Sequence, residues 1–223
     1  MKILEKKTKI QQIVNVFETG IIKGDYSNIS IFNDGPNRCK QVTYGKSQTT
    51  EFGNLKKLID LYINNKGKNA QLLQPYVLKI GVTPLHQDIK FIQLLKESGK
   101  DPIMISTQDI FFDTHYWLPA IRWCNANGIE TPLGGLVIYD SYIHSGSILS
   151  FLRNKFQARV PIAGGKEDIW IIEYLNARKA WLSNHSNQIL TKTVYRVNNM
   201  LNAVSRDDWE LLQPFNSNGI IVV

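Results

Sequence analysis

The sequence is poor in the residues that build disulfide frameworks, and it lacks long apolar runs. Its two cysteines, Cys39 and Cys124, are far apart. Two cysteines form neither a disulfide framework nor a zinc ligand set, so we expect reduced thiols, with one long-range disulfide as the alternative. No apolar run approaches the roughly 18 residues of a membrane span. Residues 1–9 are basic, but no apolar run or cleavage site follows, so no signal peptide is visible and the localisation stays open.

Several common catalytic patterns are also missing. The sequence has no phosphate-binding glycine loop and no nucleophile-elbow motif. Its four histidines are isolated from one another, and no metal-ligand spacing is present: His86, His115, His144 and His185. We therefore expect neither a metal nor another cofactor. Carboxylates are the remaining candidates for catalytic groups.

What the chain does contain is typical of a globular protein. Hydrophobic residues make up 43% of the 223 residues, and five Trp, nine Tyr and nine Phe exclude disorder. The length fits one large domain or two small lobes. The net charge of +7 favours polyanionic partners, although a solvated basic surface without any partner explains it equally well.

Helical periodicity dominates the chain outside one polar stretch. Residues 21–52 are rich in Asn, Asp, Gly, Ser and Thr and predict loops with a small β-hairpin. Residues 218–223 are β-like and are expected to dock on the body. The apolar spacing predicts helices over residues 10–18, 54–64, 84–98, 107–127 with a kink at Pro119, 132–142, 147–157, 167–183 and 189–202.

Two carboxylates stand out by their positions. Glu18 lies at the predicted end of an apolar-faced helix, where the helix dipole and limited hydration both favour the protonated carboxyl of a general acid. Asp34-Gly35 is a turn signal beside the β-prone Val42-Thr43-Tyr44. A helix-end Glu that faces a loop Asp across a cleft is the arrangement of a two-carboxylate glycosidase. The alternatives are an exposed surface glutamate and an ordinary turn.

The order of short motifs resembles the chitosanases of glycoside hydrolase family 46, which belong to the lysozyme-like superfamily. Phe17-Glu18, Asp34-Gly35, Val42-Thr43-Tyr44-Gly45 and Thr-Thr-Glu-Phe-Gly-Asn-Leu at 49–55 resemble the amino-terminal lobe of that family. The resemblance continues in three later segments, which span residues 139–146, 164–167 and 174–180.

This resemblance implies a mainly α, two-lobed lysozyme-like fold with a small β-hairpin element in the first lobe. Residues 1–223 would form a single hydrolase unit, with a small lobe over approximately residues 20–80. The activity implied is an inverting endo-hydrolysis of β-1,4-linked amino-sugar polymers, namely chitosan, without a cofactor. We expect a monomer with no nucleic-acid partner, and family members are usually secreted.

The resemblance also assigns roles to individual residues. Glu18 matches the general acid, Asp34 the base that activates water, and Thr43 the threonine that holds this water. Asp140 and Arg178 match a buried charge network that braces the acid. The residues expected to bind substrate are Arg38, Tyr44, Asn54 and Glu167.

Some departures from the family pattern leave alternatives open. The spacing from Asp34 to Thr43 is longer than usual, so Asp25 is a second candidate for the base. Asn54 and Asn176 are neutral where the family offers acids, and the basic net charge suits an anionic polymer better than chitosan. The competing hypotheses are a peptidoglycan muramidase of the endolysin kind and a non-catalytic basic domain that binds glycan or nucleic acid.

Overall fold

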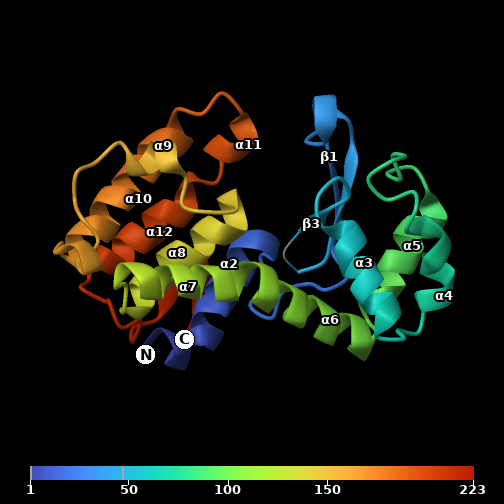
Figure 1. Ribbon diagram of the computed structural model, residues 1–223, viewed down its shortest axis with the longest axis horizontal. Helices are drawn as coiled ribbons and strands as arrows, with labels where there is room; N and C mark the ends of the chain where they lie inside the picture. Colours follow the sequence, from blue (N-terminus) through green and yellow to red (C-terminus); the bar gives the residue numbers. More distant parts are fainter. Residues whose placement is uncertain (1, 47) are drawn as a thin grey trace. The chain divides into compact units, whose positions relative to one another are not determined.

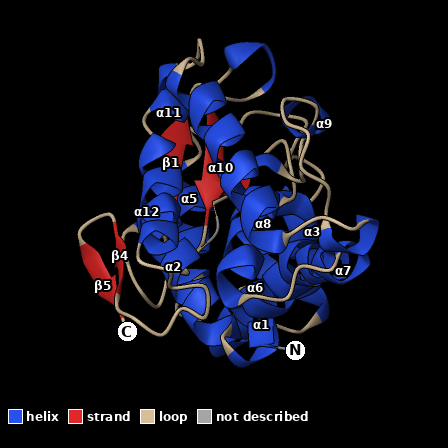
Figure 2. Ribbon diagram, turned by 90° about the vertical axis from the view of Figure 1, so that its left-hand side faces the viewer, coloured by secondary structure: helices blue, strands red, loops and turns tan. Residues whose placement is uncertain are grey.

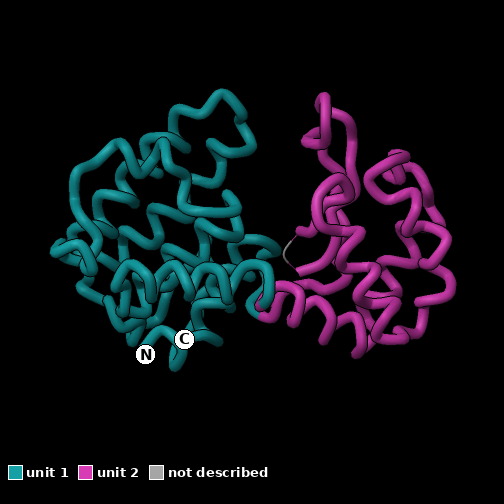
Figure 3. The backbone as a smooth tube through the Cα atoms, in the orientation of Figure 1, with its two compact units in different colours: residues 1–22, 114–223 teal, residues 23–113 magenta. Residues whose placement is uncertain are grey.

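The computed structural model describes residues 2–46 and 48–223. The chain divides into two compact units, which Figure 3 shows in different colours. Unit 1 combines the segment that ends at Ile22 with Thr114–Val223, and unit 2 is Lys23–Asp113. Unit 2 thus extends past the boundary near residue 80 that the sequence suggested. Among the described residues, no helix combines the length and the apolar character needed to cross a membrane.

Unit 1 is built around one central apolar helix, α8 (Pro132–Ser145). Every residue from Pro132 to Ser141 is buried, and helices α2, α7, α10 and α12 all pack against α8 (Figures 1 and 2). The helix begins where the sequence predicted, because the Thr131 hydroxyl accepts a hydrogen bond from the Gly134 N–H (3.1 Å). The other elements of unit 1 are α1 (Lys2–Glu5), α2 (Lys7–Thr19), α7 (Leu118–Asn127), α9 (Ser150–Arg153), η4 (Pro161–Ala163), α10 (Glu167–Ser183), α11 (Gln188–Thr191), α12 (Val194–Ser205), β4 (Phe215–Ser217) and β5 (Ile220–Val222).

Two glycines allow neighbouring elements to approach α8 closely. A Cβ at Gly135 would lie 2.6 Å from the Ile3 side chain, and one at Gly134 would collide with the Glu167 carboxylate. The β4–β5 hairpin packs on α2, and the Ser217 hydroxyl donates to the Ile13 carbonyl (3.1 Å). The β-like carboxyl-terminal segment therefore docks on the body of unit 1.

Unit 2 combines a small antiparallel sheet with helices. The sheet has the strand order β1-β2-β3, and its register pairs Ile29 with Tyr44 and Thr43 with Thr50. The predicted hairpin is thus present and gains a short third strand. The elements of unit 2 are β1 (Ile29–Phe32), η1 (Pro36–Arg38), β2 (Gln41–Tyr44), β3 (Thr49–Thr50), α3 (Leu55–Asn64), α4 (Ala70–Leu73), η2 (Gln74–Tyr76), α5 (Ile89–Ser98) and α6 (Pro102–Phe112).

Four predicted helices differ from the structure, and the one expected over residues 147–157 is reduced to α9 (Ser150–Arg153). The helix expected to open at Thr83-Pro84 begins at Ile89, because the Asp88 carboxylate accepts the Phe91 N–H (2.9 Å) and caps α5 there. Residues 107–127 are not one kinked helix: α6 passes through a π-helical turn, Asp113–Trp117, before α7 begins, with Pro119 in the first turn of α7. Residues 189–202 form α11 and α12 instead of one helix.

Candidate active site

Glu18 lies in the last turn of α2, two residues before the left-handed cap at Gly20. The Gly20 N–H donates to the Val16 carbonyl (2.9 Å) and ends the helix at that point. The Glu18 side chain is 14% exposed, and its Oε1 pairs with Nη1 of Arg196 at 2.7 Å. The Arg196 guanidinium also lies over the Phe17 ring, 5.1 Å from its centroid. The end of α2 is therefore fixed to α12.

Arg196 connects Glu18 to a second, fully buried carboxylate on α8. Its Nε and Nη2 atoms both donate to Oδ1 of Asp140, at 3.0 and 2.7 Å. Nη1 of Arg178, on α10, donates to the other oxygen, Oδ2, at 2.6 Å. Asp140 thus lies between two guanidinium groups, and Arg196 bridges it to Glu18. Asp140 and Arg178 were predicted from the sequence, whereas Arg196 was not, because it shares no local motif with them.

The charges of this network stabilise the ionised forms of Asp140 and Arg196. Burial alone would raise the pKa of Asp140, but the guanidinium groups of Arg196 and Arg178 outweigh it and lower that pKa to about 2. Burial alone would lower the pKa of Arg196, yet the carboxylates of Asp140 and Glu18 raise it. His144, half-buried near the same groups, has its pKa lowered to about 3 by burial and by the two arginines.

In unit 2, Asp34 is oriented by a buried amide. Asp34 itself is exposed, and its Oδ1 accepts a hydrogen bond from Nε2 of Gln41 at 2.9 Å. Gln41 is only 5% exposed, and its Oε1 accepts the Phe52 N–H at 3.2 Å. The amide is therefore held at both ends, which restricts the direction in which Asp34 points. Gln41 carried no signal in the sequence beyond its place in a β-prone run.

Thr43 lies in the middle of β2 and is almost completely buried. Among the described residues, its Oγ1 has no hydrogen-bond partner. The neighbouring backbone is fixed by Glu51, a buried residue whose carboxylate accepts the Val42 N–H (2.9 Å) and the Leu85 N–H (2.8 Å). A buried hydroxyl without a protein partner is a natural position for a bound water.

Asp25, the second candidate for the base, forms a hydrogen bond within its own loop. Oδ1 of Asp25 accepts the N–H of Ser27 (2.8 Å) in a turn that precedes β1. This side-chain hydrogen bond closes the turn within the loop itself. In contrast, Asp34 is held by a residue of the strand that carries Thr43. The local geometry therefore favours Asp34 over Asp25.

The structure contradicts one of the four residues expected to bind substrate and gives a second one a structural contact. Tyr44 has no exposed surface, so its ring cannot contact a sugar and instead fills the core of unit 2. Glu167 is occupied at the start of α8, where it accepts the N–H groups of Glu130 and Thr131 and the Thr131 hydroxyl (3.0, 3.0 and 2.6 Å). Arg38 is exposed in η1, and Asn54 is partly exposed just before α3.

Neither thiol is part of the network around Glu18. Cys39 and Cys124 are both free, so the alternative of one long-range disulfide is wrong. Burial raises the pKa of the Cys124 thiol to about 12, so this group is inert. In the part of the chain that the structure describes, no three His, Cys, Asp or Glu residues are grouped closely enough to hold a metal ion.

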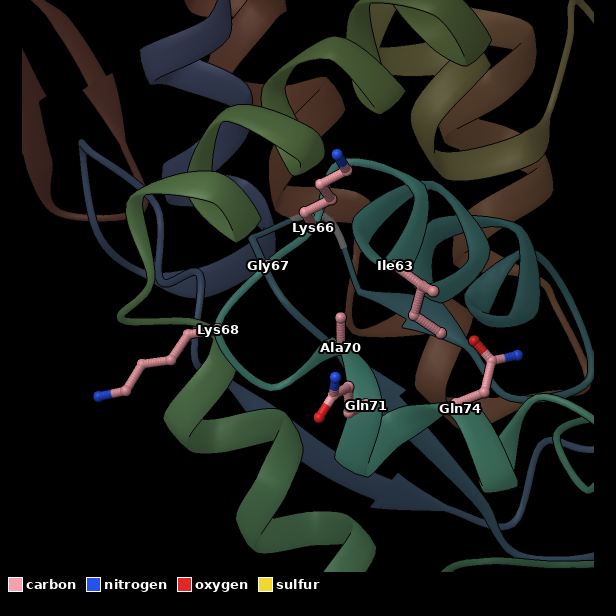
Figure 4. Close-up of a pocket in the computed structure, with 7 residues that line it drawn as sticks. All are labelled: Ile63, Lys66, Gly67, Lys68, Ala70, Gln71 and Gln74. Atoms are coloured by element: carbon pink, nitrogen blue, oxygen red, sulfur yellow. The ribbon is translucent and has the colours of Figure 1, made fainter.

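One surface hollow does not coincide with these residues. It lies in unit 2, has a volume of about 660 Å³ and is lined by Ile63, Lys66, Gly67, Lys68, Ala70, Gln71 and Gln74. Figure 4 shows the side chains of Lys66 and Lys68 extending in different directions. This hollow contains none of the candidate catalytic residues.

Comparison with known proteins identifies the family. A chitosanase of Bacillus subtilis (strain 168) is 24% identical over 196 residues, which cover 82% of this chain and 69% of that protein. The crystal structure of a mutant chitosanase from Bacillus subtilis MY002, complexed with six GlcN, superposes with a TM-score of 0.85 at 21% identity and covers 98% of both chains. A family 46 chitosanase from Gynuella sunshinyii, in complex with chitotetraose, has a TM-score of 0.80 at 18% identity and covers 97% of this chain and 96% of its own. These likenesses confirm the predicted mainly helical fold with a small antiparallel β element. A family model described as glycosyl hydrolase family 46 matches residues 12–215, and the chain therefore belongs to this family.

Proposed function

We propose that this family 46 enzyme hydrolyses chitosan within the polymer and inverts the configuration at the anomeric carbon. The observation that carries the proposal is Glu18 at the end of α2, bound by Arg196 and through it to the buried Asp140. The chitosanase relatives, among them one bound to six GlcN and one bound to chitotetraose, support chitosan as the substrate.

In the proposed reaction, Glu18 and Asp34 act on opposite faces of one sugar ring. Protonated Glu18 gives its proton to the glycosidic oxygen as the bond from this oxygen to the anomeric carbon breaks. A water molecule attacks the anomeric carbon from the other face and transfers a proton to the carboxylate of Asp34. Inverting enzymes place these carboxyl groups about 6.5–9.5 Å apart, so that the water fits between them. We expect that separation in the substrate complex.

The surrounding residues hold these groups in position. Arg196 fixes the carboxyl of Glu18, and Asp140 with Arg178 fixes Arg196. The unpartnered hydroxyl of Thr43 supports a role in holding the attacking water, and Gln41 restricts Asp34. Arg38 and Asn54 are the remaining candidates for contacts to the sugar.

Parallel assays on two polymers test the substrate. The enzyme is incubated with chitosan and with purified peptidoglycan, and new reducing ends are measured, with the Glu18→Gln variant as the blank. We expect release from chitosan that the variant lacks. Release from peptidoglycan alone would replace chitosan by a cell-wall polymer, which the net charge of +7 and the neutral Asn54 and Asn176 favour.

The stereochemistry tests the mechanism separately. Proton NMR of the fresh product, recorded before mutarotation, should show the α anomer at the new reducing end. A β anomer as the first product would exclude the single-displacement mechanism and remove Asp34 as the base that activates water.

A further inference from the structure

Unit 1 contains a second hollow that the proposed reaction does not use. This pocket, which we call the α7–α9 pocket, has a volume of about 380 Å³. The volume lies near the lower end of the range for small-molecule sites, about 300–1,000 Å³. Its lining includes two arginines but no carboxylate: Trp123, Asn127, Ile148, Ser150, Arg153, Arg159, Val160 and Ala163. None of these residues belongs to the network of Glu18, Arg196, Asp140 and Arg178.

One wall of the α7–α9 pocket is a tightly packed loop. The N–H groups of Ala163 and Gly165 both donate to the Val160 carbonyl, at 2.9 and 3.1 Å. A Cβ at Gly165 would collide with the Arg159 carbonyl. Where the loop meets the left-handed cap of α7, a Cβ at Gly128 would lie 3.0 Å from the Pro161 side chain. This wall is therefore formed before any ligand binds.

Backbone carbonyl groups, which carry no net charge, hold the Arg153 guanidinium in place. Its Nη1 and Nη2 donate to the carbonyl oxygens of Phe156 and Ala158, both at 2.9 Å, and the guanidinium lies 4.7 Å from the centroid of the Phe156 ring. The carboxylate of Glu173, from α10, accepts the Ala158 N–H instead (3.0 Å). Carbonyl dipoles orient a guanidinium but leave its full positive charge.

Arg159 adds a second positive charge to the same pocket. Its side chain is exposed, and among the described residues neither Arg159 nor Arg153 forms an ion pair with a carboxylate. Two guanidinium groups at one hollow repel an amino sugar and attract an anion, to which each offers a planar set of donors. The α7–α9 pocket is therefore unsuited to the protonated glucosamine units of chitosan.

The rest of the lining suits a sugar ring. Trp123 lies against Trp170, with ring centroids 5.3 Å apart, and this fixes an aromatic surface at the pocket. Nδ2 of Asn127 donates to the Trp123 carbonyl (2.8 Å), and this leaves the amide oxygen of Asn127 as an acceptor for a hydroxyl. Ile148 and Val160 complete the apolar part of the lining.

We propose that the α7–α9 pocket binds an acidic sugar, that is, a pyranose bearing a carboxylate or a phosphate group. The anionic group contacts Arg153 and Arg159, and the ring packs on Trp123. Such a site allows a basic enzyme to attach to an anionic glycan while its catalytic residues act on a cationic one. Binding at this pocket does not depend on the proposed reaction.

Isothermal titration calorimetry on the full chain tests the proposal. The ligands are a trigalacturonate, glucose 6-phosphate and, as the cationic control, glucosamine, each at low and at physiological salt. We expect binding of at least one acidic ligand and none of glucosamine. Arg159→Gln should weaken that binding about tenfold, whereas Lys179→Gln, which removes an exposed charge on α10 outside the pocket, should change it less than twofold.

The outcomes separate the proposal from general electrostatic attraction. Binding of trigalacturonate alone or glucose 6-phosphate alone supports the site and identifies the anionic group that it takes. The proposal would be overturned if neither acid binds at about 20 mM. It would also be overturned if Arg159→Gln and Lys179→Gln weaken the binding of the acid equally. Because chitosan hydrolysis is not the readout, a chain without chitosanase activity would still test this pocket. An unchanged circular dichroism spectrum and unchanged chitosan hydrolysis establish that Arg159→Gln folds normally.

Discussion

At the scale of the single residue, Glu18 is the side chain on which the proposed reaction most depends. Glu18→Gln keeps the size of the side chain and an oxygen that faces Arg196, but the amide has no proton to donate. General acid assistance is typically worth about 10²–10⁴-fold. We expect kcat on chitosan to fall by at least the upper value while the thermal midpoint changes little. Turnover similar to that of the wild type would remove Glu18 from the reaction.

Gln41 allows a test of the proposed base that leaves Asp34 in place. Gln41→Met keeps the length of the side chain but removes both the donor to Asp34 and the acceptor for the Phe52 N–H. We expect kcat to fall about tenfold with KM nearly unchanged, because a misdirected base affects the reaction more than binding. Gln93→Met, which removes an exposed glutamine bonded to Glu97, is the control. An equal loss in both variants would mean that Gln41 has no specific role.

The site residues that the sequence indicated lie in local motifs, whereas those that it did not indicate have no such motif. Glu18, Asp140 and Arg178 lie in ordered motifs, so local pattern and family resemblance were enough to name them. Arg196 and Gln41 act only through partners that are distant in the sequence or hidden by the fold. Tyr44 was misassigned because a motif does not show which face of a strand is buried.

At the scale of the element, the ion pair between α8 and α10 is a structural requirement. Without Arg178, the carboxylates of Asp140 and Glu18 share the single charge of Arg196, and removing one partner of a buried pair typically costs about 3–5 kcal/mol. We therefore expect Arg178→Ala to lower the free energy of unfolding by that amount in urea titrations and to reduce activity as well. Lys179→Ala, at the exposed next position of α10, should stay within about 0.5 kcal/mol. If the two variants are equally stable, Asp140 does not depend on Arg178.

The carboxyl end of α8 makes stability depend on pH through His144. Burial and the two arginines lower its folded-state pKa to about 3, whereas the unfolded chain takes up this proton near pH 6.5. The stabilisation that comes from keeping His144 neutral is therefore fully present above pH 6.5, and it is lost as the pH falls from there toward 3. Between pH 7 and pH 5 the wild type should lose about 2 kcal/mol through this group. Urea midpoints should show that His144→Gln removes this part of the slope, and equal slopes in both proteins would contradict the assignment.

The sequence indicated the bounds of two helices well, although only one of them begins at a capping side chain. Thr131-Pro132 starts α8 as expected, and α10 spans the predicted residues 167–183. The start of α5 was misplaced because Thr83-Pro84 imitates a helix start while the actual cap is Asp88. The break between α11 and α12 was missed because the apolar spacing continues through it.

At the scale of the whole molecule, a basic enzyme and a cationic polymer present an electrostatic conflict. The chain carries a net charge of +7, and chitosan is positively charged in mildly acidic solution. Long-range repulsion between them should slow their encounter at low ionic strength. Salt shortens the screening length from about 30 Å at 0.01 M to about 10 Å at 0.1 M, and this removes most of the repulsion.

This conflict predicts an unusual salt dependence of the reaction. We expect kcat/KM on long chitosan to rise about two- to fivefold between 10 and 100 mM NaCl, because screening affects the net charge more than the short-range contacts of bound sugar. Replacing the exposed Lys56 and Lys57 of α3 by Glu lowers the net charge from +7 to +3, so the double variant should be faster at 10 mM and less sensitive to salt than the wild type. Steady-state rates at constant pH measure both effects. A steady decrease of kcat/KM with salt in the wild type would show that acidic groups near the substrate, and not the net charge, control the encounter.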